Sequence, residues 1–272
     1  MSLKLNATPE AYKAFPQKGT ASNVEQMPKL IAEGRVPMNV AQLMQRRLDF
    51  RNGPAEVKTN WIDNYFDTGD AVVYHPDGRA KIVLDSQTLR EMTPESQRNS
   101  GALILSEDVY KTLQGEEFEK GKLGKTGEGM SKTDVKAHPV WKVLAREQTL
   151  LDDYTDFIFA EGNQRFKYDN AMGVYPSSCG GDKPEMRAWC VNRLGYGSGA
   201  VGWDDLVSDY GRLVGIAPEA LSAPGKSVRN VKAYSVEEIL NETGFTDDFA
   251  PSQIKKLTNI LEQRGYQIHR RK

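Results

Sequence analysis

Residues Pro139–Ala160 read PVWKVLAREQTLLDDYTDFIFA, and this stretch has the most regular pattern in the 272-residue chain. Its apolar residues recur at the three- and four-residue spacing of a single helix face. We therefore predict one amphipathic helix over Pro139–Ala160 and expect it to be the central element of the fold. Its apolar face would contain Val140, Val143, Leu144, Leu150, Leu151, Tyr154, Phe157 and Ile158.

One charged residue, Glu147, falls on that apolar face, one turn from Val143 and one turn from Leu151. An ionised carboxylate is costly to bury, so Glu147 must find a cation, accept hydrogen bonds, reach water or stay protonated. Paired with Arg187 or Arg193, it would be structural. With a raised pKa it could act as a general acid or base, which makes Glu147 the candidate catalytic residue.

Strand-forming residues cluster in two later regions. Ala71–Tyr74 and Ala80–Leu84 flank the turn residues Pro76-Asp77-Gly78, which predicts a β-hairpin. Three β-rich segments separated by glycines predict an antiparallel meander: Ala171–Tyr175, Met186–Leu194 and Ala200–Trp203. The expected fold is therefore α+β, with this hairpin and meander packed on helices around the central amphipathic helix.

Shorter signals complete the expected core. Ser106 follows a strand-like segment and is placed to cap a helix that runs to Leu113. The segment 115–134 is rich in Gly and Lys and is expected to be a flexible loop. The first twenty residues, with several Pro and Gly, are expected to lie on the surface, and Asp204–Leu213 to be a helix.

Prolines and a glycine near Ala223-Pro224-Gly225 predict a domain boundary, with an α+β core at 1–222 and a small basic helical unit at 223–272. Residues 225–272 hold nine Lys and Arg against six Asp and Glu. The second unit is loosely similar to the reading half of a winged helix, which would bind nucleic acid. The residues expected to contact it are Lys255, Lys256, Asn259, Gln263, Arg270 and Arg271.

Motifs for cofactors and metals are incomplete. Gly124-Lys125-Thr126 lacks the first glycine of a phosphate-binding loop, and Gly197–Gly202 does not open a helix as a dinucleotide fingerprint would. The spacing of Asp63, Asp67 and Asp70 matches no calcium loop. The two cysteines, Cys179 and Cys190, fit no zinc motif and are expected to be free thiols. We therefore predict no cofactor and no metal.

Composition narrows the function classes. The formal net charge is −1, so the whole chain lacks the excess of basic residues typical of nucleic-acid binders. No apolar run approaches the roughly 20 residues of a membrane span, and no signal-peptide pattern opens the sequence, which predicts a cytoplasmic protein without a membrane partner. The oligomeric state cannot be read from these patterns.

The leading hypothesis is a soluble intracellular binding protein, with nucleic acid bound through the C-terminal unit. A non-enzymatic function is favoured. One alternative is an enzyme with a pocket around Glu147, and another is a protein-interaction or structural component.

Overall fold

The computed structural model describes Leu5 and residues 11–16, 22–124, 128–203, 206–207 and 211–218. Contacts along the chain divide it into two units, Met1–Ser222 and Ala223–Lys272. All of the second unit lies outside the described residues. The predicted winged-helix-like arrangement and its candidate nucleic-acid contacts fall there, so the following description concerns the first unit.

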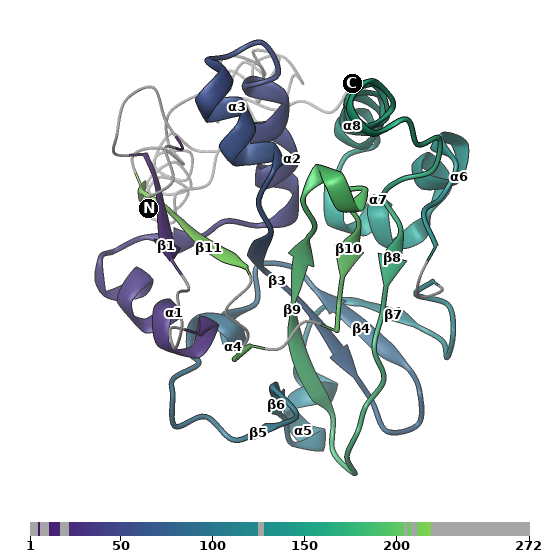
Figure 1. Ribbon diagram of the computed structural model, residues 1–272. Helices are drawn as coiled ribbons and strands as arrows, with labels where there is room; N and C mark the ends of the chain where they lie inside the picture. Colours follow the sequence, from purple (N-terminus) through teal and green to yellow (C-terminus); the bar gives the residue numbers. More distant parts are fainter. Residues whose placement is uncertain are drawn as a thin grey trace, which may run out of the picture. The chain divides into compact units, whose positions relative to one another are not determined.

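A large mixed sheet forms the centre of this unit (Figure 1). Eleven strands are assigned in the described residues, and the main path runs in the order β1-β11-β3-β9-β10-β8. The strands are β1 (Tyr12–Pro16), β2 (Val36–Pro37), β3 (Phe66–Tyr74), β4 (Ala80–Val83), β5 (Arg98–Asn99), β6 (Ala102–Ile104), β7 (Glu116–Phe118), β8 (Val174–Tyr175), β9 (Glu185–Val191), β10 (Ala200–Val201) and β11 (Arg212–Ile216).

The long strands β3 and β9 lie at the middle of the sheet, and every residue in both is buried. Because neighbouring side chains on a strand point to opposite faces, each strand contributes to two cores. Phe66, Val72 and Trp189 belong to one apolar cluster, whereas Val73 and Met186 belong to the other. The sheet is therefore covered on both faces.

Helices supply the residues that cover each face. In one cluster the sheet residues pack with side chains of α2, α3, α6, α7 and α8, and in the other with side chains of α1, α4 and α5. Their bounds are α1 (Asn23–Ala32), α2 (Val40–Asp49), α3 (Ala55–Ile62), α4 (Gln87–Arg90), α5 (Glu107–Thr112), α6 (Lys132–Ala137), α7 (Pro139–Ala145) and α8 (Gln148–Phe166), with a 3₁₀ turn η1 at Leu194–Tyr196.

This arrangement corrects the expected fold class. The sheet, not a helix, is the central element, and its pairing is mixed because β11 runs parallel to β3 and β10 runs parallel to β8. The predicted α+β arrangement of hairpin and meander around a central amphipathic helix is wrong. Parts of β3 and β9 were predicted as strands, at Ala71–Tyr74 and Met186–Leu194, but the sequence did not reveal that both lie at the middle of one sheet covered on both faces.

The predicted helix over Pro139–Ala160 is also wrong as a single element. It is broken between α7 and α8, where Arg146 adopts a left-handed conformation (φ 64°) and Glu147 is extended. The Arg146 guanidinium donates to the buried Asp70 carboxylate at 2.9 Å and to Asp85 at 2.8 Å. This long-range ion pair holds the break, which local periodicity could not reveal.

Several local predictions are confirmed. The hairpin forms with β3 and β4 antiparallel and Val72 opposite Ile82. The Ser106 side chain accepts a hydrogen bond from the Val109 N–H and caps α5. Cys179 and Cys190 are not joined in a disulfide.

Other local predictions fail. The segment 115–134 contains β7 and α6, and the early residues Tyr12–Pro16 pair with β11 across some 200 residues of sequence. The pairing of β8 with β10 is parallel, which excludes a simple meander. The end of the predicted helix at Asp204–Leu213 belongs to β11 instead.

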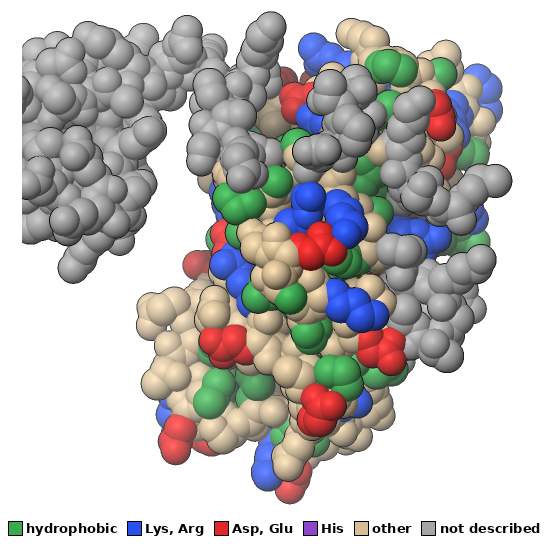
Figure 2. All heavy atoms as spheres, turned by 90° about the vertical axis from the view of Figure 1, so that its left-hand side faces the viewer, with side chains coloured by type: hydrophobic (Ala, Val, Ile, Leu, Met, Phe, Trp, Pro, Cys, Tyr) green, Lys and Arg blue, Asp and Glu red, His purple; other side chains and the backbone are tan. Residues whose placement is uncertain are grey.

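Charges of both signs are interspersed on the face shown in Figure 2, in keeping with the near-neutral composition. Within the described part of the chain, no helix is both long and apolar enough to cross a membrane.

Candidate functional site

Two exposed aromatic side chains and two arginines meet where α8 ends and η1 turns. Tyr196 is 57% exposed and Phe166 is 44% exposed, which is unusual for such large side chains. Arg193 and Arg165 are also exposed, and Tyr65, which contacts Arg193, is half-buried. We call these five residues the aromatic–arginine surface: Tyr65, Arg165, Phe166, Arg193 and Tyr196.

Ring contacts organise one half of this surface. The Arg193 guanidinium lies 4.6 Å from the centre of the Tyr196 ring and 5.6 Å from that of Tyr65. The two tyrosine rings are 5.9 Å apart. Hydrogen bonding with Tyr196 raises the pKa of Arg193, so the side chain stays cationic, as any arginine does at physiological pH.

The other half is built on the C-terminal turn of α8. Arg165 lies over the Phe166 ring at 5.2 Å and donates to the Asp63 carboxylate at 2.7 Å. The Phe166 ring also stacks on Tyr168, whose hydroxyl donates to the Leu194 carbonyl at the start of η1. The end of α8 is thereby fixed against η1.

A residue in the left-handed conformation ends each of the two segments. Lys167 ends α8 in the left-handed conformation, and Gly197 ends η1 with φ 71°. The Gly195 backbone lies against Phe166, since a Cβ built on Gly195 would be 3.4 Å from the ring Cζ. A positive φ suits glycine because it has no Cβ, which explains Gly197.

A fully buried arginine, Arg47 on α2, ties together the segments that carry this surface. Its guanidinium donates five hydrogen bonds to uncharged oxygens, and no carboxylate among the described residues contacts it. Two of the acceptors directly precede Tyr65 and Arg193 in sequence. The acceptors are the carbonyls of Trp61 (2.8 Å), Asn64 (3.3 Å) and Asn192 (3.2 Å) and the hydroxyls of Tyr154 (2.7 Å) and Ser198 (3.4 Å).

Chemically, this surface is suited to binding. Guanidinium groups over aromatic rings offer both a cation and a large apolar area to a partner. Within the described residues no ion pair joins a carboxylate to Arg193, whereas Arg165 is paired with Asp63. The surface therefore presents one cation, Arg193, that no carboxylate of the described residues pairs with.

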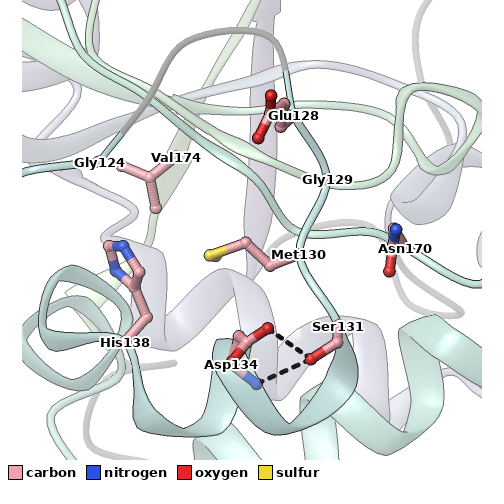
Figure 3. A pocket seen from close by; sticks show the side chains of 9 residues that line it. All are labelled: Gly124, Glu128, Gly129, Met130, Ser131, Asp134, His138, Asn170 and Val174. Atoms are coloured by element: carbon pink, nitrogen blue, oxygen red, sulfur yellow. Dashed lines mark hydrogen bonds between the residues drawn. The ribbon is translucent and has the colours of Figure 1, made fainter.

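A separate hollow of about 460 Å³ lies beside α6 and the start of α7. Figure 3 shows the His138 ring projecting toward Gly124 and Val174, with Met130 between His138 and Asn170. The hollow is lined by Gly124, Glu128, Gly129, Met130, Ser131, Asp134, His138, Asn170 and Val174.

The structure places Glu147 at the surface. It is exposed at the start of α8, so the premise of a carboxylate buried on an apolar face is wrong. The expected partners Arg187 and Arg193 lie elsewhere: Arg187 donates to the carbonyl of Ser100, and Arg193 contacts Tyr65. A catalytic role for Glu147 stays a prediction without that support.

The three aspartates considered as a metal site are also separated in their contacts. Asp63 pairs with Arg165, and Asp70 pairs with Arg146. Burial raises the pKa of the Asp70 carboxyl, which Arg146 and the backbone N–H groups of Asp85 and Val40 offset in part. No group of three or more His, Cys, Asp or Glu side chains suited to a metal occurs in the described part of the chain.

Sequence reasoning missed the aromatic–arginine surface because exposure cannot be read from residue type. Its signal was weak: Arg193 and Tyr196 lie in a glycine-rich turn, and Arg165-Phe166 end a helix. Turn residues carry binding groups more often than regular elements do, so aromatic residues within such turns merit notice.

The comparisons with known proteins bear on the fold. No protein-family model and no curated protein matches the sequence. A solved structure reported as "Accommodation of massive sequence variation in Nanoarchaeota by the C-type lectin fold" superposes with a TM-score of 0.55 at 14% identity, covering 78% of this chain and 100% of that chain. At this identity the likeness concerns architecture alone. The chain is thus similar in fold to a C-type lectin fold protein, which also contradicts the expected packing around a central helix.

Proposed function

We propose that this protein is a binding module whose aromatic–arginine surface engages an acidic and partly apolar segment of a partner protein. The observation that carries this proposal is the exposure of Tyr196 and Phe166 beside two arginines, on segments held by the buried Arg47. Tyr and Arg are enriched among the residues that contribute most to protein–protein affinity.

Charge decides which partner suits the surface. Arg165 is already paired with Asp63, whereas the neighbours of Arg193 in the described structure are aromatic rings and not carboxylates. A carboxylate on the partner would satisfy Arg193, while apolar groups beside it would cover Tyr196 and Phe166. Because Arg47 fixes the flanking backbone, little ordering would be needed on binding, which favours affinity.

The fold likeness supports this proposal. The similar structure is reported to accommodate massive sequence variation on the C-type lectin fold. A scaffold that tolerates changes in its side chains can present residues chosen for binding and not for stability. The buried sheet and the Arg47 hydrogen bonds would provide such a scaffold here.

The other hypotheses from the sequence remain predictions. Nucleic-acid binding through Lys255, Lys256 and Arg270 concerns residues outside the described part of the chain. A cytoplasmic location likewise rests on sequence patterns alone. Catalysis at Glu147 is no longer supported by burial of its carboxylate, because the side chain is exposed.

Site-specific photo-crosslinking would test the proposal. We expect a photoreactive phenylalanine at position 196 to capture a distinct protein in the native cell. The same group at Trp203, which is 53% exposed and makes no ring contact with the surface, is the matched control. The purified protein should then bind the unmodified chain, and Tyr196→Ser or Arg193→Ala should weaken that binding at least about tenfold, whereas Trp203→Ser should not.

Two results would reject the proposal. One is that positions 196 and 203 capture the same proteins, which would indicate non-specific contact. The other is that the purified partner binds the Tyr196→Ser and Arg193→Ala variants as tightly as the unmodified chain.

A further inference from the structure

The hollow beside α6 has the composition of a small-molecule site. Its volume of about 460 Å³ lies within the range of roughly 300–1,000 Å³ that such sites occupy. Met130 and Val174 provide apolar surface, and Ser131, Asp134 and His138 provide polar groups close by (Figure 3). This mixture can hold a ligand that has both a hydrocarbon part and a polar end.

Close backbone contacts between residues 128–130 and 170–173 form one wall of the hollow. Met130 and Ala171 exchange two backbone hydrogen bonds of 2.8 and 3.0 Å. A Cβ on Gly173 would collide with the Glu128 carbonyl, and one on Gly129 would lie 3.0 Å from the Asn170 carbonyl carbon. Glycine at both positions lets the two segments approach, so the wall is a packed structure.

The charged residues that line the hollow are acidic. Glu128 and Asp134 both line it and both are exposed, while no Lys or Arg is among its described lining residues. The lysines of the adjacent helix, Lys132 and Lys136, are paired with Asp156 on α8 at 2.8 and 2.7 Å. The carboxylates of Glu128 and Asp134 therefore favour a cation as ligand.

His138 supplies an unused hydrogen-bonding group. Its Nδ1 atom is buried and has no hydrogen-bond partner among the described residues. Such a buried atom without a partner costs free energy unless a water or ligand satisfies it. Burial lowers the pKa of the imidazole, so the ring is neutral near pH 7 and does not repel a cation.

We propose that this hollow binds a small aliphatic diamine or guanidino-amine, with one cationic group at Glu128, the other at Asp134, and the hydrocarbon chain between them along Met130 (Figure 3). An N–H of such a ligand could also donate to the His138 imidazole. The site does not share residues with the aromatic–arginine surface, so it is independent of the proposed partner binding.

Calorimetric titration of the full chain with agmatine, which carries one guanidinium and one ammonium, would test this site. We expect saturable binding at millimolar concentration and no binding of succinate, which has the opposite charge. Glu128→Gln and Asp134→Asn should each lower the association constant about tenfold. Glu95→Gln, at an exposed acid remote in sequence, and Tyr196→Ser should leave it unchanged.

An NMR titration would locate the bound ligand. The amide signals of Gly129, Met130 and His138 should shift with agmatine concentration, whereas those of η1 should not. The proposal is overturned if agmatine shows no saturable binding, if Glu95→Gln weakens binding as much as Glu128→Gln, or if the shifts fall elsewhere.

Discussion

Arg47, within α2, and Arg146, at the break between α7 and α8, show two ways in which an arginine stabilises irregular segments of this fold. Arg47 is fully buried and donates only to uncharged oxygens in the described structure. Arg146 is partly exposed and bridges the buried Asp70 and the more exposed Asp85. Arg47 joins irregular segments through hydrogen bonds to their backbone carbonyls. Arg146 links the break between α7 and α8 to the Asp70 carboxylate. The difference implies that the two arginines should respond differently to substitution.

Replacing Arg47 by alanine should have the largest effect on stability. The change removes five hydrogen bonds, leaves their oxygens buried and creates a cavity between α2, α8 and η1. We expect a loss of about 3–5 kcal/mol in the free energy of unfolding, measured by urea denaturation. Arg51→Ala, at an exposed position, is the control.

Arg47→Lys would sharpen this result. An ammonium cannot reach all five acceptors in the planar arrangement of a guanidinium, so we expect lysine to recover less than half of the loss. Full recovery by lysine would show that the positive charge matters and the five-bond geometry does not.

Replacing Arg146 by alanine should cost less, about 2–3 kcal/mol. The buried Asp70 would lose its cation but keep hydrogen bonds from the N–H groups of Val40 and Asp85, and it could be protonated. In a double-mutant cycle, Asp70→Asn should reduce the cost of Arg146→Ala. Independent, additive effects of the two changes would contradict the ion pair as the reason for the helix break.

His138 offers a smaller, pH-dependent contrast with both arginines. Burial lowers the pKa of its imidazole in the folded state below the ordinary value of 6.5. As the pH falls through about 6.5, the unfolded chain takes up a proton that the folded chain resists, so the stability present above this pH is lost.

The comparison that isolates His138 uses His138→Asn, since Asn suits the N-terminal cap position of α7. We expect the urea midpoint to fall less in this variant than in the unmodified protein between about pH 7.5 and about pH 5.5. Equal falls in both proteins would show that His138 does not contribute to the pH dependence.

Tyr196→Ser should have the smallest effect on stability. Because Tyr196 is 57% exposed, its removal should change the free energy of unfolding by less than about 0.5 kcal/mol. Binding to a partner protein should nevertheless weaken. This result would distinguish Tyr196, which acts in binding, from Arg47, which acts in stability. A large loss of stability would indicate that Tyr196 is a packing residue.

Local signals in the sequence predicted local structure. Pro76-Asp77-Gly78 gave the hairpin and Ser106 gave a helix cap, because turns and caps depend on residues a few positions apart. The break at Arg146 was not predictable in this way. Its partner Asp70 is 76 residues distant, and the apolar spacing runs on through Leu144, Leu151 and Tyr154, all of them buried.

The candidate site was predictable only in part for a related reason. Glu147 was proposed as a site residue because one continuous helix would bury its side chain. The helix is broken at Arg146 and Glu147 is exposed, so the prediction of burial is wrong. Arg193 and Tyr196 become notable only when Tyr65, some 130 residues earlier, is brought against them. Contacts of this separation depend on the pairing of β3 with β9, which a single sequence does not specify.

The position of β11 has a consequence for how the chain folds. This strand lies between β1 and β3, yet it is the last strand in the described sequence. Until residues 212–216 have left the ribosome, β1 lacks the strand that it pairs with in the described structure, and β3 lacks its partner at Asp67. The far end of β3 can already pair with β4, over Ala71–Tyr74. Closing a loop of about 200 residues makes the pairing of β1 with β11 slow. During synthesis, β1 and the start of β3 around Asp67 would be the segments most in need of protection from aggregation.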